Sequence, residues 1–288
     1  EKVVKIPVLM VDWEDFNPAT DMSNPNNPNS IEDDEYRQLT VEQVKAFLSA
    51  ENSPAQYFTD VSGGKFKVEF EVFDWFRSSD EGSLIKPRAD YLYLSEHDGR
   101  WYCNRDQVMK DVLKEAILNK GLDPNDYDLN HNLREQEEGL MNGAILLYEG
   151  GPGSCSGTNM SWFDVGGFEP GEFVEQAVLT SFNLNKLVTE NQQQQQQLSL
   201  LNKILRVYVN MPESSVYNSD FFGWVHELGH MYLGFPDYYY PKFNMGHFAL
   251  SANSPNLDAF SPAGFEKWLF AKWIEPQEIE GSAGVSIT

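Results

Sequence analysis

GWVHELGHMYLGFPDYYY, residues 223–240, is the stretch that decides the fold. It holds two histidines four residues apart, His226 and His230, and it follows two residues typical of helix N-caps, Ser219 and Asp220. The spacing predicts a helix with both imidazoles on one face, one turn apart. Two imidazoles in this arrangement can bind one Zn²⁺ at about 2.0–2.1 Å.

Glu227 is the residue that we expect to act on water. It directly follows His226 in the helix, so its carboxylate can reach a water on the metal without binding the ion. Such a carboxylate can take the proton of that water and pass it to a leaving amine. The alternative is an ordinary helix that happens to carry two histidines. With 5 histidines and 44 acidic residues in 288, a chance match has an expectation on the order of 0.01, so the pattern favours a zinc peptidase.

Asp237 is the third ligand that we expect, because a catalytic zinc usually has three protein ligands. Gly234 can end the helix in a left-handed turn, and Pro236 prevents the helix from resuming. The arrangement resembles the metzincin pattern HExxHxxGxx(H/D), with one more residue between His230 and the glycine. We expect this insertion to lengthen the helix by about 1.5 Å and 100°, unless a longer or distorted turn offsets it. The alternative third ligands are Glu266, on a second helix, and His247.

Apolar periodicity in the rest of the chain predicts alternating strands and helices. Strands are predicted at residues 4–12, 65–76, 143–151 and 204–211. Helices are predicted at residues 40–51, where Thr40 begins a capping box, and at 104–121 and 261–273. This order indicates one α/β domain with a mixed twisted sheet, an active-site helix and a C-terminal helix. We expect the domain to span residues 1–280, in parts of about 1–230 and 231–280, with 281–288 beginning a further segment.

Composition restricts the partners of the chain. The formal net charge is −23, which repels phosphate, so nucleic acid is not an expected partner. No run of about 18 apolar residues predicts a transmembrane segment, and we expect a monomer. The two cysteines, Cys103 and Cys155, allow one internal disulfide and lack the spacing of a metal or redox site. The glutamine run at 192–197 indicates a surface insertion or a polar helix extension.

Six blocks of the chain are similar, in order, to blocks of the immune inhibitor A family of secreted bacterial metallopeptidases. The blocks are IPVLMVDW, SPAQYFTDVSGGKFKVEFEVFDW, GLDPNDYDLNHN, GAILLYEGGPGSCSG, HELGHMYLGFPDYYY and GHFALSANSPNLDAFSPAGFEKWLFAKWIEP. The resemblance covers most of the chain and implies a metzincin-like catalytic domain. It implies a secreted or cell-surface zinc endopeptidase that acts on proteins or peptides, with ligands His226, His230 and Asp237 and with Glu227 as general base.

The chain also departs from this family at two places. In relatives a DxNxDG run can bind Ca²⁺, and the corresponding positions here are Asp126, Asp128 and Asn130, without the tight acidic loop. The methionine normally found beneath the zinc is replaced by Ser251, unless Met245 takes its place from a shifted turn. The missing methionine, together with the displaced Gly-x-x-Asp after His230, leaves open a second hypothesis, a catalytically weak or inactive family member that acts as a protein- or glycoprotein-binding module.

Overall fold

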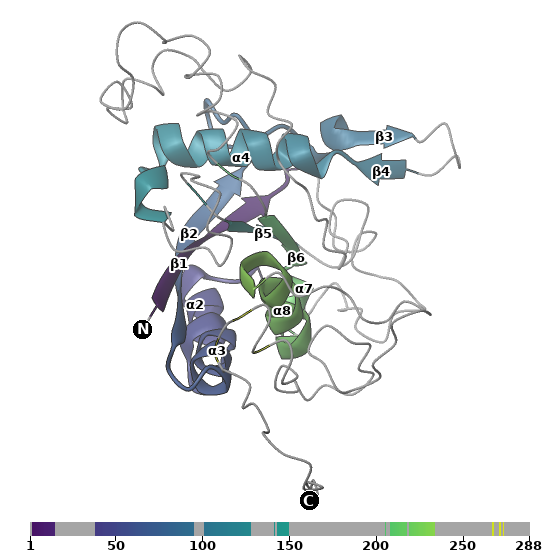
Figure 1. The fold of residues 1–288 in the computed structure, drawn as a ribbon. Helices are drawn as coiled ribbons and strands as arrows, with labels where there is room; N and C mark the ends of the chain where they lie inside the picture. The colour runs from purple at the N-terminus through teal and green to yellow at the C-terminus, as the bar shows by residue number, and fades with distance from the viewer. Residues whose placement is uncertain are drawn as a thin grey trace, which may run out of the picture.

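Strands and helices alternate along the chain (Figure 1). The structure is a computed structural model, and it describes residues 2–14, 38–94, 101–127, 141, 143–149, 205, 208–217, 219–233, 267, 271 and 273. The strands are β1 (Lys2–Asp12), β2 (Phe66–Arg77), β3 (Leu92–Leu94), β4 (Trp101–Cys103), β5 (Ala144–Tyr148) and β6 (Tyr208–Pro212). The helices are α2 (Val41–Ser49), α3 (Pro54–Val61), α4 (Arg105–Asn119), α7 (Ser214–Tyr217) and α8 (Phe221–Leu228), with shorter turns η1 (Arg88–Tyr91), η2 (Pro124–Tyr127) and η4 (Gly229–Leu233).

Four of the strands form one sheet in the order β2-β1-β5-β6. Every pairing in it is parallel, and one row of aligned residues crosses all four strands, namely Val72, Val8, Ile145 and Val209. The chain is therefore an α/β protein, as predicted. The expected mixed sheet is wrong for the described strands, because the order of patterned segments along a sequence does not specify the direction in which they pair. The short strands β3 and β4 form a separate antiparallel pair.

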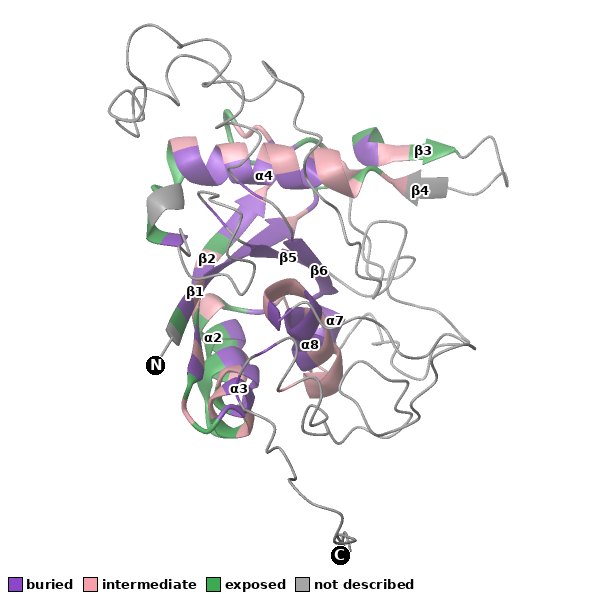
Figure 2. Cartoon of the chain, in the orientation of Figure 1, coloured by how far each residue is buried: buried purple, intermediate pink, exposed green. Residues whose placement is uncertain are grey.

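Helices cover both faces of the parallel sheet, which explains why its central strands are apolar on both sides. On one face, α4 packs Val108, Val112 and Ala116 into a core with Leu9 and Leu146. On the opposite face lie α2, α3 and α8 (Figure 1), and their buried side chains share a second core with the row of valine and isoleucine residues described above. Figure 2 shows the strands buried between these layers.

Local signals in the sequence account for most of these elements. The capping box at Thr40 is confirmed, since its hydroxyl accepts from Gln43 N and its own N–H donates to the Gln43 side chain. The predicted helix at 104–121 is α4, and Gly121 follows it at φ +74°, a conformation that favours glycine. The four predicted strands are β1, β2, β5 and β6. The predicted C-terminal helix lies outside the described residues apart from 267, 271 and 273.

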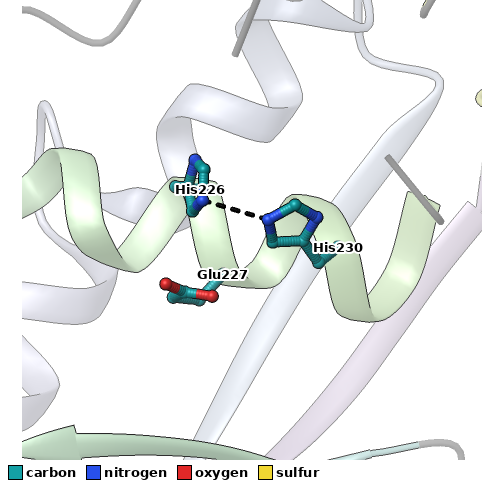
Figure 3. A group of neighbouring side chains, drawn as sticks. All are labelled: His226, Glu227 and His230. Atoms are coloured by element: carbon teal, nitrogen blue, oxygen red, sulfur yellow. Dashed lines mark hydrogen bonds between the residues drawn. The ribbon is translucent and has the colours of Figure 1, made fainter. Parts of the chain in front are cut away.

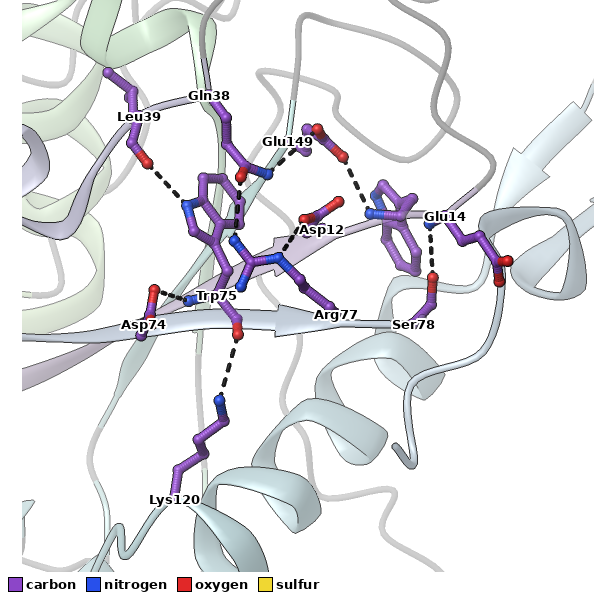
Figure 4. A network of polar contacts seen from close by, with 11 residues as sticks. Asp12, Glu14, Gln38, Leu39, Asp74, Trp75, Arg77, Ser78, Lys120 and Glu149 are labelled. Carbon is purple, nitrogen blue, oxygen red and sulfur yellow. Dashed lines mark hydrogen bonds and ion pairs between the residues drawn. The ribbon is translucent and has the colours of Figure 1, made fainter. Parts of the chain in front are cut away.

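Polar side chains tie together the carboxyl ends of three strands (Figure 4). Arg77, at the end of β2, forms an ion pair with Asp12, at the end of β1 (2.9 Å). Arg77 also donates to the side-chain oxygen of Gln38 (3.2 Å), whose amide donates to Glu149 (3.4 Å), directly after β5. Glu149 accepts a further hydrogen bond from the backbone N–H of Trp13 (3.1 Å). These contacts hold the chain segments on either side of residues 15–37 against the edge of the sheet.

Cys103, on β4, is disulfide-bonded, and the other cysteine in the sequence, Cys155, lies outside the described residues.

Within the part of the chain that the structure describes, no helix has both the length and the apolar character needed to cross a membrane.

Candidate metal centre

The helix that carries the two histidines begins at a side-chain cap. The Asp220 carboxylate accepts a hydrogen bond from Gly223 N (3.0 Å) and so satisfies one of the free N–H groups of the first turn. A Cβ at position 223 would collide with this carboxylate where it now lies, so any other residue there would displace the capping group. Ser219, the other predicted cap residue, instead lies before the cap with φ +51°. A second contact anchors the helix, because Trp224 Nε1 donates to Ser215 Oγ (2.9 Å) in α7, the short helix that follows β6.

One side of α8 packs against the sheet and buries Trp224, Val225 and Leu228. This orientation places His226 and Glu227 in half-buried positions, whereas His230, in the following turn, is 1% exposed. The three side chains extend from neighbouring turns (Figure 3). Packing of the apolar side therefore decides which way the imidazoles point.

The two imidazoles meet edge to face. His226 Nε2 and His230 Nε2 are 3.0 Å apart, and the ring centroids are 4.5 Å apart with an interplanar angle of 87° (Figure 3). Ligand atoms of both histidines and Glu227 lie within 4.8 Å of one another. Two nitrogens bound tetrahedrally to Zn²⁺ at about 2.0–2.1 Å would be about 3.3 Å apart. The observed spacing is close to this value, so the pair fits a zinc ion with a small adjustment of either ring.

The turn that contains His230 is not α-helical. Residues Gly229–Leu233 form η4, a turn of π-helix, whose hydrogen bonds join residues five apart, so that it holds one residue more than an α-helical turn. Leu228 and Leu233, five residues apart, are both buried on the sheet side. Of the two alternatives that the sequence left open, a lengthened α-helix and a distorted turn, the structure shows the distorted turn. The extra residue widens one turn, because that keeps the apolar side chains facing the sheet.

Two aromatic residues accompany the histidines. The ring of Phe222 lies 5.6 Å from that of His226, one turn earlier on the helix. Tyr232 lies within the π turn, and burial raises the pKa of its hydroxyl above the usual value for tyrosine, so this group is protonated at neutral pH. Neither residue was singled out from the sequence, since an aromatic residue at helical spacing has the same pattern whether it packs in a core or beside a metal.

Most of the remaining predicted site residues lie outside the described residues. These are the expected third ligand Asp237, its rivals Glu266 and His247, the positions Met245 and Ser251, and two of the expected calcium ligands, Asp128 and Asn130. The other calcium candidate, Asp126, is exposed in η2. The structure thus brings together His226, Glu227 and His230.

Comparison with known proteins gives no relatives: no family model and no curated protein matches the chain. The resemblance to the immune inhibitor A family stays a prediction.

Proposed function

We propose that this chain is the catalytic domain of a zinc-dependent endopeptidase with a metzincin-like fold. His226 and His230 bind the metal, and Glu227 is the general base. One observation carries the proposal: two imidazole nitrogens lie 3.0 Å apart on one side of a helix, with a carboxylate in the same group of potential ligand atoms. Structural zinc sites usually have four protein ligands, with cysteine prominent. The described group has no cysteine, which favours a catalytic site over a structural one.

Each group of the site has a separate role in peptide hydrolysis. A bound Zn²⁺ would lower the pKa of a water towards about 7 and polarise the substrate carbonyl. Glu227 takes the proton from the attacking water and delivers it to the leaving amine, so the carboxylate is regenerated after each turnover. His230 is buried and His226 is half-buried, so His226 faces the side from which the substrate approaches.

Asp237 completes the ligand set in this proposal. The one-residue excess between His230 and Gly234 would rotate the following chain by about 100° if the helix continued as an α-helix. The π turn supports Asp237, because it absorbs the extra residue before Gly234. With the extra residue absorbed in this way, Asp237 would follow Gly234 at the spacing of the pattern HExxHxxGxxD, in which the aspartate is the third ligand.

The proposal includes a location outside the cell, with a protein or peptide as substrate. Disulfides persist in oxidising compartments and are rare in the cytosol, so the bonded state of Cys103 supports export. A net charge of −23 favours basic or neutral substrates over acidic ones.

A single substitution tests the role of the general base. Glu227→Gln should retain one zinc per chain but lose peptide hydrolysis by about 10²–10⁴-fold, the usual contribution of general acid–base catalysis. Zinc would be measured by elemental analysis after dialysis, and hydrolysis by cleavage of casein and of a quenched peptide library with and without a chelator. The matched control is Glu42→Gln, which makes the same change at an exposed residue of α2 and should cleave like the wild type.

Three outcomes would contradict parts of the proposal. Wild-type cleavage by Glu227→Gln would remove Glu227 from its role. Full zinc content in a His226→Ala/His230→Ala variant would place the metal elsewhere. Zinc bound by both histidines without any chelator-sensitive cleavage would favour the second hypothesis, a protein- or glycoprotein-binding module.

A further inference from the structure

Gly143 lies directly before β5, on the face of the sheet that α8 covers. Side chains alternate along a strand, and Ile145 and Leu147, two and four residues later, belong to the core on that face. A Cβ built at position 143 would lie 2.6 Å from Met231 Sδ, 2.8 Å from Tyr232 Oη and 3.2 Å from Met231 Cγ. Favourable contacts between carbon atoms are about 3.5–4.0 Å. An alanine at position 143 would therefore fit only if the ends of the Met231 and Tyr232 side chains moved away.

The residues that occupy this space belong to the widened turn. Met231 and Tyr232 are the last two of the four residues between Leu228 and Leu233, where η4 holds one residue more than an α-helical turn. Among the described residues, Tyr232 Oη has no hydrogen-bond partner although it is buried. Its position is therefore set by packing against the sheet and not by a hydrogen bond. Gly143 is the point at which the sheet makes room for the extra residue.

We propose that Gly143 is a positioning residue for the metal centre: by leaving space for Met231 and Tyr232 it allows the π turn to form and so holds His230 against His226. This inference rests on the proposed function, because it concerns the same metal. Residues 230, 231 and 232 are consecutive in one short turn, so a displacement of the last two moves the first. A methyl group added at position 143, far from the metal in sequence, changes the distance between the two Nε2 atoms.

The first experiment compares Gly143→Ala with the wild type. The variant should bind Zn²⁺ about 10- to 100-fold more weakly, the usual cost of losing a group that orients a metal ligand. Zinc affinity would be measured by competition with a chromophoric chelator. The visible spectrum of the Co²⁺-loaded protein should shift, because it reports ligand geometry, which a loss of stability alone leaves unchanged. The control is Ile145→Val, which trims the same face of the same strand and should retain the wild-type spectrum.

The second experiment removes the atoms that Gly143 accommodates. In a Met231→Ala/Tyr232→Phe background the sulfur and the hydroxyl are absent, so adding Gly143→Ala should change zinc affinity by less than about threefold, as for residues that no longer interact. The same triple variant provides the test if Gly143→Ala alone does not fold, since it should fold and bind Zn²⁺.

The results separate this inference from the proposed function. It is overturned if Gly143→Ala binds Zn²⁺ and Co²⁺ like the wild type, if the cost of the substitution is the same in both backgrounds, or if the triple variant does not fold. If instead the wild type binds no Zn²⁺ through His226 and His230, the proposed function itself has failed, and the positioning role of Gly143 fails with it.

Discussion

Helices α4 and α8 pack on opposite faces of the same sheet (Figure 1), and they differ in how regular their helical geometry is. Each begins with a side-chain cap, Asn104 for α4 and Asp220 for α8. The helix α4 runs for 15 residues without interruption. The helix α8 runs for 8 residues and widens into a π turn at His230. Both helices bury apolar residues against the sheet, but α8, unlike α4, runs directly into a π turn, and this turn holds one of the candidate metal ligands. Such departures from regular helix are frequent at functional sites.

The largest expected effect comes from a matched pair of leucines. Leu113 in α4 and Leu228 in α8 are both fully buried, so changing either to alanine should lower the free energy of unfolding by about 2–5 kcal/mol. Urea denaturation of the zinc-free proteins would measure this. Leu228→Ala should also weaken zinc binding, because Leu228 fixes the helix between His226 and His230. An equal loss of zinc affinity in Leu113→Ala would show that packing on the α4 face affects the metal centre as much as packing on the α8 face.

The two caps form a second pair, with a smaller expected effect. Asp220→Ala and Asn104→Ala each remove a side chain that accepts from a first-turn N–H, so each should cost about 0.5–2 kcal/mol of stability in thermal unfolding. Asp220→Asn keeps an accepting oxygen and should recover most of the loss. We expect weaker zinc binding in Asp220→Ala alone. A normal zinc affinity in that variant would show that the start of α8 does not influence the histidines.

The smallest expected effect is a pH dependence of the free energy of unfolding, and it comes from Glu71 on the α4 side of the sheet. Partial burial raises the pKa of the Glu71 carboxyl, but hydrogen bonds from Lys5 and Tyr127 and the charge of Lys5 outweigh it, so the pKa is lowered. A lowered pKa in the folded state means that the contribution is present above the unfolded pKa and is lost as the pH falls through the folded value. The ion pair is partly exposed, so the contribution is less than about 1 kcal/mol.

Glu71→Gln tests this contribution. In a plot of the free energy of unfolding against pH, the variant should lose less stability than the wild type as the pH falls into the acid range. The control is Glu69→Gln, an exposed residue on the same strand, which should leave the curve unchanged. Zinc affinity measured at neutral pH should be unaffected in both variants. A change in zinc affinity for Glu71→Gln would contradict the separation of the two faces.

The elements predicted correctly are those with a local cause. The capping box at Thr40, the apolar stripe of α4 and the buried run of β5 each depend on neighbours within a few residues along the chain. The mixed sheet was predicted wrongly for the described strands, which pair in parallel in the four-stranded sheet, because the direction of pairing depends on which segments meet in space. Gly143 was not singled out, although a glycine beside an apolar strand is a known sign of close backbone approach. Its partners Met231 and Tyr232 lie almost ninety positions further along the sequence.

By itself, the sequence determined that His226 and His230 share one side of a helix with Glu227 beside them, since helical spacing is a local property. Tertiary structure alone decided how the extra residue before Gly234 is accommodated. A helix in isolation would continue as an α-helix, because that is its favoured geometry. Here Leu228 and Leu233 both pack against the sheet, and Gly143 leaves space for the residues between them, so burial of apolar side chains outweighs the regularity of the helix.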